Sequence, residues 1–168
     1  MNKIAVIGCG GSGKSCFSQE LGRRLAIPVH HLDRIFWQPN WNPMDKSKFL
    51  DAQQQIFTTD SWIIDGNYGG TMQPRLAAAD AIIFLDLSTL SCLWGVIKRY
   101  FKYRNKTRPD MGTGNKERLT LEFIHWILFY RSTRRPKIIT KLDDYSKSKQ
   151  VTVLSSRQAV DQFIEATS

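Results

Sequence analysis

The sequence contains little cysteine and little histidine. Among 168 residues there are three cysteines and three histidines, and the cysteines at positions 9, 16 and 92 form no CxxC pair. An odd number of widely spaced cysteines argues against a disulfide framework and against a zinc site. We therefore expect a protein of a reducing compartment, the cytoplasm.

The sequence also lacks a long hydrophobic run. The longest apolar stretch, residues 81–97, is interrupted by Asp86 and by several serines and threonines. A membrane-spanning helix needs about 20 mostly apolar residues. The N-terminal apolar run, Ile4–Ile7, is too short for a secretion signal. We expect no membrane segment and no signal peptide.

Acidic residues are outnumbered, with 15 Asp and Glu against 24 Lys and Arg and a net charge of +9. The excess is local, because residues 98–149 hold 15 basic and 5 acidic residues, whereas the rest of the chain holds 9 and 10. This distribution argues against a uniformly cationic surface. It fits either a nucleic-acid-binding patch or a clamp for a polyanionic small molecule.

Short apolar runs alternate with stretches of helical periodicity. The runs predict strands at 4–7, 28–32, 62–64, 81–85 and 151–154, and the periodicity predicts helices at 15–25, 45–57, 88–103, 117–130, from Pro136 onward, and at 158–166. Strands that alternate with helices indicate a parallel sheet, and continuous apolar runs indicate strands buried on both sides. The sequence predicts one α/β domain over residues 1–168.

A glycine-rich segment between the first predicted strand and helix fits the pattern G-x-x-x-x-G-K-[ST]. Its glycines let successive backbone N–H groups face phosphate oxygens, and the following helix presents its positive N-terminal end to the same anion. Lys14 then reaches the β- and γ-phosphates, and the Ser15 hydroxyl binds Mg²⁺. The predicted ATP-binding residues are Gly8, Gly10, Gly11, Ser12, Gly13, Lys14, Ser15 and Cys16.

Two aspartates directly follow predicted strands. Asp33 comes after the strand at 28–32, and Asp65 comes after the strand at 62–64. Ligands of open α/β sheets bind at the carboxyl ends of the strands. Asp33 is therefore a candidate to orient or deprotonate an acceptor hydroxyl, and Asp65 is a candidate, with Ser15, for the Mg²⁺ site. The alternative is a structural role, as a helix-cap or turn aspartate for Asp33 and as a turn aspartate before Gly66 for Asp65.

The basic segment is rich in arginine. Arg104 and Arg108 lie four residues apart, and Arg135 belongs to a second group further along the chain. A guanidinium offers a rigid fork of donors to phosphate oxygens and stabilises charge on a transferring phosphoryl group. We expect these three arginines and Lys14 to act in catalysis. For any one arginine the alternative is a solvated surface charge.

Several blocks of this sequence are similar to those of known families. The chain resembles the adenylate-kinase-like P-loop kinases and, more closely, the DNA topology modulation (FlaR-type) proteins. The matching blocks run through most of the chain and are IAVIGCGGSGKS (Ile4–Ser15), PVHHLDRIFW (Pro28–Trp37), WIIDGNYGGT (Trp62–Thr71), ADAIIFLDLS (Ala79–Ser88), YRNKTRPDM (Tyr103–Met111) and RRPK (Arg134–Lys137).

The resemblance implies a P-loop NTPase three-layer sandwich, in which a five-stranded parallel sheet has helices on both faces and a helical lid. It implies an acceptor-binding insertion at about 33–60 and a basic lid at about 102–118. Adenylate kinases continue their third strand as Asp-Gly-Phe-Pro-Arg, whereas Asn67 and Tyr68 follow Asp65-Gly66 here. The arginine that grips a nucleoside monophosphate is absent from its place, which argues against AMP as acceptor.

We therefore favour a small-molecule or nucleotide kinase that uses ATP and Mg²⁺. The aromatic residues Phe36, Trp37, Trp41 and Tyr68 are candidates to line the acceptor pocket, although core packing is the favoured interpretation for Phe36 and Trp37. A nucleic-acid-associated ATP-binding protein is the alternative, because aromatic residues interleave with the basic ones. Against it, we expect Trp94 and Trp126 to pack inward.

A GTPase is the least favoured of the functions considered. The segment Thr140–Asp143 imitates the T-K-x-D sequence that reads guanine, but it would have to end a strand. Pro136 and the polar residues around it predict a helix instead.

Overall fold

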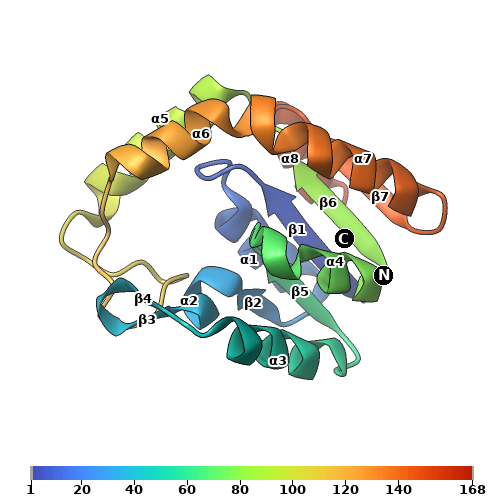
Figure 1. Ribbon diagram of the computed structural model, residues 1–168. Coiled ribbons are helices and arrows are strands. Elements are labelled where there is room, and N and C mark those ends of the chain that lie inside the picture. The colour runs from blue at the N-terminus through green and yellow to red at the C-terminus, as the bar shows by residue number, and fades with distance from the viewer. Residues whose placement is uncertain (1, 168) are drawn as a thin grey trace.

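The structure is a computed structural model that describes residues 2–167 (Figure 1). A five-stranded parallel sheet runs in the order β2-β5-β1-β6-β7. Its strands are β1 (Lys3–Gly8), β2 (Val29–His31), β5 (Trp62–Asp65), β6 (Ala81–Leu85) and β7 (Gln150–Leu154). Each is within a residue or two of a run predicted from the sequence, and the α/β fold with a parallel sheet is confirmed.

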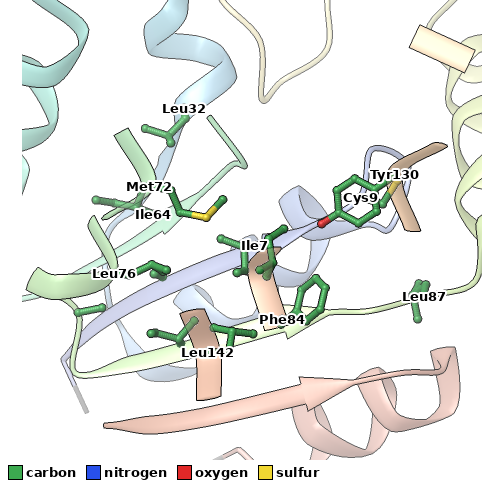
Figure 2. Packing of buried hydrophobic residues seen from close by; sticks show 14 of the residues in the cluster. Ile7, Cys9, Leu32, Ile64, Met72, Leu76, Phe84, Leu87, Tyr130 and Leu142 are labelled. Atoms are coloured by element: carbon green, nitrogen blue, oxygen red, sulfur yellow. The ribbon is translucent and has the colours of Figure 1, made fainter. Parts of the chain in front are cut away.

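Two hydrophobic clusters explain why the strands are apolar on both faces. On one face, α1 (Lys14–Leu25) and α8 (Arg157–Glu165) pack against alternate strand residues such as Ile4 and Val6. The opposite face is covered by helices α3 (Lys46–Phe57), α4 (Gly69–Ala78), α5 (Thr89–Tyr103), α6 (Leu121–Thr133) and α7 (Arg135–Ser146). Figure 2 shows Ile7 and Phe84 of the sheet within this second cluster.

The insertion after β2 contains several short elements. These are α2 (Leu32–Phe36), β3 (Trp37–Gln38), the 3₁₀ helix η1 (Pro39–Trp41) and β4 (Asn42–Pro43). Strands β3 and β4 pair in antiparallel fashion, and we call residues 37–43 the β3–β4 hairpin. The sequence did not predict the hairpin, because each of its strands has only two residues.

Helix α4 is a second element that the sequence did not predict. Two glycines begin it and Pro74 lies inside it, and these residue types are poor helix formers. Burial of Met72 and Leu76 in the core outweighs that poor intrinsic propensity.

Helices α5 and α6 pack together and are joined by residues 104–120, which we call the α5–α6 segment. The segment has two isolated backbone bridges and otherwise irregular structure. Figure 1 shows it descending from the two helices toward the β3–β4 hairpin. Helix α6 begins at Leu121, later than expected, because the Thr120 side chain caps its first turn. Across residues 2–167, each helix is too short or too polar to cross a membrane.

Candidate functional site

The glycine-rich segment 8–15, which we call the phosphate-binding loop after its predicted role, connects the central strand β1 to the first helix α1. Strand β1 ends at Gly8, and α1 begins at Lys14 without a side-chain cap on its first turn. Gly11 and Gly13 have φ values of 78° and 91°, a left-handed conformation that glycine adopts without strain. Inside the loop the Lys14 ammonium donates to the Cys9 carbonyl at 2.8 Å. Burial lowers the pKa of Lys14, although the carboxylates of Asp65 and Asp33 raise it in part.

Helix α5 lies directly on this loop. A Cβ atom added to Gly95 would meet the carbonyl oxygen of Gly11, and one added to Gly11 would meet the carbonyl oxygen of Cys92. Two glycines, one in the loop and one in the helix, therefore allow the two backbones to touch. The position of the loop depends on the position of α5.

This contact predicts an unusual effect for Gly95→Ala. Alanine normally stabilises a helix interior by about 1 kcal/mol relative to glycine. Here we expect the substitution to push α5 and the loop apart and to weaken MgATP binding at least tenfold, as measured by calorimetry. Gly70→Ala is the control, because a Cβ there has ordinary contacts with the Lys46 side chain. Unchanged MgATP affinity in Gly95→Ala would contradict the prediction.

A cavity of about 1040 Å³ opens beside the loop. Most of the predicted site residues line it, namely Gly10, Gly11, Gly13, Lys14, Ser15, Cys16, Asp33, Asp65 and Arg108. Gly8 and Ser12 are buried beneath the loop surface. The structure thus brings the loop, two strand-end carboxylates and one arginine to a single cavity.

Two predicted arginines lie elsewhere. Arg104 is exposed at the C-terminal end of α5 and is not among the residues that line the cavity. Arg135 is bound by Asp86, whose two carboxylate oxygens accept from its guanidinium at 2.7–2.9 Å. The structure does not bring these two arginines together with Arg108.

Asp33 is held by two neighbours at the cavity wall. The Tyr68 hydroxyl donates to its Oδ1 at 2.6 Å, and the Arg108 guanidinium lies 3.8 Å from its Oδ2. The Asp33 side chain remains 42% exposed, so the carboxylate is accessible from the cavity. Burial and the negative charge of Asp33 raise the pKa of Tyr68 far above its usual value, which keeps this hydroxyl protonated. Tyr68 therefore fixes the orientation of the carboxylate.

Arg108 is a buried guanidinium among carboxylates. Besides Asp33, it contacts Asp110 at 3.1 Å and Glu117 at 2.7 Å. Glu117 also binds Arg99 at 3.0 Å, so one buried carboxylate bridges two arginines. Burial would raise the pKa of Asp110, but the charge of Arg108 and the Ser15 hydroxyl outweigh it and lower the pKa. This network holds Arg108 at the cavity.

Asp65 uses only one of its two oxygens within the protein. Its Oδ1 lies 2.9 Å from His31 Nδ1, because β2 and β5 pair with these two residues opposite each other. Burial would lower the pKa of His31, but the hydrogen bond and charge of Asp65 raise it overall. The other oxygen, Oδ2, is buried without a hydrogen-bond partner.

The residues present fit a magnesium ion. Mg²⁺ takes oxygen ligands, keeps several waters, and is bound through one or two protein groups plus substrate phosphates. Ser15 and Asp65 line the same cavity, and their side chains have oxygens of this kind, one of which, Asp65 Oδ2, has no partner within the protein. Residues 2–167 contain no group of three or more His, Cys, Asp or Glu arranged to hold a metal by themselves. An ion here would therefore depend on phosphate oxygens for further ligands.

Arg157 was not predicted as a site residue. It begins α8 and donates to the carbonyls of Ser12 at 2.9 Å and Gly11 at 3.3 Å, so it supports the phosphate-binding loop. Its position just after the last strand, at the ligand-binding edge of the sheet, is the signal that would have pointed to it.

Arg75 is a second unpredicted residue. It is fully buried and donates to the carbonyls of Gly66 and Asn67, both at 3.0 Å. Asn67 Oδ1 in turn accepts from the Gly8 N–H at 3.0 Å. Arg75 therefore fixes the turn after Asp65 and connects it to the phosphate-binding loop. This role was not predictable from the sequence, because α4 itself was not predicted.

Replacement of Arg75 should destabilise the fold. Burial lowers its pKa to about 10, so the group is still charged at neutral pH. In Arg75→Met, the carbonyls of Gly66 and Asn67 lose their donors inside the core, and each such loss costs about 1–3 kcal/mol. We expect the free energy of unfolding in urea to fall by about 2 kcal/mol or more.

The control is Arg23→Ala on the surface of α1. Arg23 forms an exposed ion pair with Glu20, and such pairs contribute about 0–1 kcal/mol. Equal stabilities of Arg75→Met and Arg23→Ala would contradict the structural role of Arg75.

The aromatic residues are distributed differently from expectation. Trp37, Trp41 and Tyr68 line the cavity, whereas Phe36 packs among aromatic neighbours in the core. The expectation that Trp94 packs inward is wrong, because its side chain is 61% exposed. Its helix turns Cys92 and Val96 toward the core, and Trp94 lies between them on another face.

Comparison with solved structures identifies the type of fold. A gluconokinase from Sinorhizobium meliloti 1021 is 13% identical, with a TM-score of 0.56 over 98% of this chain and 87% of that chain. A shikimate kinase from Acinetobacter baumannii in complex with shikimate is 12% identical, with a TM-score of 0.58 over 98% and 89%. A shikimate kinase from Bacteroides thetaiotaomicron is 13% identical, with a TM-score of 0.53 over 96% and 93%.

Comparisons of the sequence with protein-family models and with curated proteins give no match. The similarity therefore rests on three-dimensional structure. This chain has the α/β fold of small P-loop kinases.

Proposed function

We propose that this chain is an ATP-dependent phosphotransferase that acts on a small molecule or a nucleotide. One observation carries the proposal: the phosphate-binding loop, the accessible carboxylate of Asp33 and the buried guanidinium of Arg108 line one cavity. Several solved structures that share the fold are named as kinases. At 12–13% identity they support the reaction class and do not identify the acceptor.

In this proposal ATP binds with its phosphates on the loop Gly8–Ser15. The Lys14 ammonium exchanges its hydrogen bond to the Cys9 carbonyl for hydrogen bonds to the β- and γ-phosphate oxygens. Ser15 and Asp65 would hold Mg²⁺, which neutralises charge on those phosphates. Arg157 stabilises the loop through two of its carbonyls.

The acceptor binds on the opposite side of the cavity. Asp33 orients or deprotonates an acceptor hydroxyl. The hydrogen bond from Tyr68 holds the Asp33 carboxylate in its orientation. The α5–α6 segment acts as the lid and supplies Arg108, whose guanidinium moves from Asp33 to the transferring phosphoryl group. Arg104 and Arg135 have no assigned step in this mechanism.

An acceptor screen tests the proposal. The full chain is incubated with MgATP and with nucleoside monophosphates, nucleosides, sugar acids or small cyclic hydroxy acids, and ADP release is measured. We expect one class to stimulate ADP release well above the rate with water alone. Failure of all classes, together with failure to bind MgATP in calorimetry, would refute a kinase function.

A nucleic-acid-associated function, in line with the resemblance to DNA topology modulation proteins, is the second candidate. It is favoured by the exposure of Trp94 and Phe101, at 61% and 69%, beside Lys98 and Lys102 on α5. Exposed aromatic and basic side chains together suit single-stranded nucleic acid. Single-stranded DNA is therefore included in the same screen. Tight DNA binding with a steep salt dependence, and no acceptor-stimulated ADP release, would favour this candidate.

A further inference from the structure

The β3–β4 hairpin has little internal support. Its two strands pair through only two residues each, Trp37 with Pro43 and Gln38 with Asn42. Asn40 and Trp41 both have left-handed φ values, of 64° and 60°, which non-glycine residues rarely adopt. A two-stranded hairpin is marginal in water even without such strain. Contacts from elsewhere in the chain must therefore hold this one in place.

Asn115 of the α5–α6 segment provides those contacts. Its side-chain oxygen accepts from the Trp41 backbone N–H at 2.6 Å, and its side-chain NH₂ donates to the Trp37 carbonyl at 3.1 Å. Asn115 is fully buried. One amide thus satisfies an acceptor on strand β3 and a donor at the end of η1, the turn of the hairpin.

Three further contacts join the same two segments. The Trp41 indole N–H donates to the Lys116 carbonyl at 3.1 Å, and the Arg118 guanidinium lies 4.2 Å from the centre of the Trp41 ring. A Cβ atom added to Gly112 would lie 2.6 Å from the Trp37 carbonyl oxygen, so the backbones are in close contact. The α5–α6 segment itself is irregular, and each segment therefore orders the other.

Both segments contribute to the cavity. Trp37 and Trp41 of the hairpin line it, as do Arg108 and Arg118 of the α5–α6 segment. We propose that Asn115 is a positioning residue that couples acceptor binding on the hairpin to placement of Arg108 at the phosphoryl group. The inference rests on the proposed function for its catalytic consequence. Its structural part, the joint ordering of two segments, is independent of that function.

Coupling of this kind is reciprocal. A ligand that orders the hairpin also orders the α5–α6 segment, and a ligand that orders the segment also orders the hairpin. Loss of the connection between them weakens these two effects equally. The phosphate-binding loop belongs to β1 and α1 and has no hydrogen bond to Asn115. Loss of the Asn115 hydrogen bonds to the hairpin should therefore change acceptor binding and turnover, and it should leave MgATP affinity nearly unchanged.

Hydrogen–deuterium exchange of the full chain tests the joint ordering. In Asn115→Ala the two hydrogen bonds to the hairpin are lost, and we expect amide exchange to rise on the order of tenfold in both 37–43 and 104–120. Residues 3–8 of β1 serve as the internal reference. Thr113→Ala, an exposed change in the same turn, should leave both segments as in the wild type.

A milder variant covers the case in which Asn115→Ala does not fold. Trp41→Phe keeps an aromatic ring beside Arg118, and it removes the indole donor to Lys116 together with one of the two fused rings. We expect it to raise exchange in both segments by a smaller factor. Wild-type exchange in the hairpin, in a variant whose α5–α6 segment exchanges faster, would overturn the coupling.

The kinetic arm uses the acceptor found by the screen. We expect Asn115→Ala to raise the acceptor KM on the order of tenfold and to lower kcat, with the MgATP Kd within twofold of wild type. Equal losses of MgATP and acceptor affinity would refute a positioning role. If exchange behaves as expected but no acceptor is found and MgATP does not bind, the joint ordering stands and the kinase proposal fails. If the chain is a kinase and exchange is unchanged, the coupling fails.

Discussion

Lys14→Ala is expected to lower ATP-dependent turnover by about 10²–10³-fold, the range measured when one preorganised donor to a developing charge is removed. The Lys14 ammonium lies within the phosphate-binding loop, bonded to the Cys9 carbonyl and facing the cavity. Without it the β- and γ-phosphates would lose the one cation that the phosphate-binding loop itself supplies. Turnover is measured as ADP release with the acceptor at saturation.

Two comparisons make this result interpretable. Lys14→Met keeps most of the aliphatic stem, so a folded but inactive Lys14→Met protein separates loss of charge from loss of packing. Lys48→Ala removes an exposed lysine from α3 and should have wild-type turnover. Circular dichroism reports whether each variant is folded. Full turnover in a folded Lys14→Ala protein would refute ATP-dependent transfer at this loop.

Asp33→Asn is expected to lower kcat by about 10²–10⁴-fold for a hydroxyl acceptor, the range for removal of a general base. The side chain keeps its shape and its hydrogen bond from Tyr68, but it no longer accepts a proton. MgATP affinity should be nearly unchanged, because Asp33 follows β2 and lies outside the phosphate-binding loop. Single-turnover kinetics separate the chemical step from product release.

The same variant distinguishes two kinds of acceptor. A phosphate acceptor is already deprotonated and needs no base, so its turnover should change little in Asp33→Asn. Asp51→Asn, on the exposed surface of α3, is the control for removing a negative charge. An unchanged kcat with a hydroxyl acceptor would remove Asp33 from the mechanism.

The sheet and the phosphate-binding loop were predictable because their signals are local. A continuous apolar run such as Ala81–Leu85 specifies a strand buried on both faces, and β6 has these same bounds. The loop is specified by four residue types at fixed spacing. The position of Asp33 and Asp65 at the cavity was predictable because parallel strands bring their carboxyl ends to one edge.

Other parts of the site were not predictable, because they depend on contacts between distant residues. Asn115 meets the hairpin across 74 positions, and Arg157 meets the loop across 145. Neither contact leaves a periodic pattern in the sequence. The helix at 88–103 was predicted, but the sequence did not show that Trp94 lies outside its buried face.

The contact between Gly95 and Gly11 gives helix α5 a pivot. From Gly95 to the end of the helix at Tyr103 there are eight residues, which span about 12 Å at 1.5 Å per residue. A tilt of about 10° about the glycine contact would therefore move the start of the α5–α6 segment by about 2 Å, simply from the helix rise. The point about which the helix would turn lies on the phosphate-binding loop. A rotation of α5 about this contact would leave the loop almost in place and would shift the segment that holds Arg108.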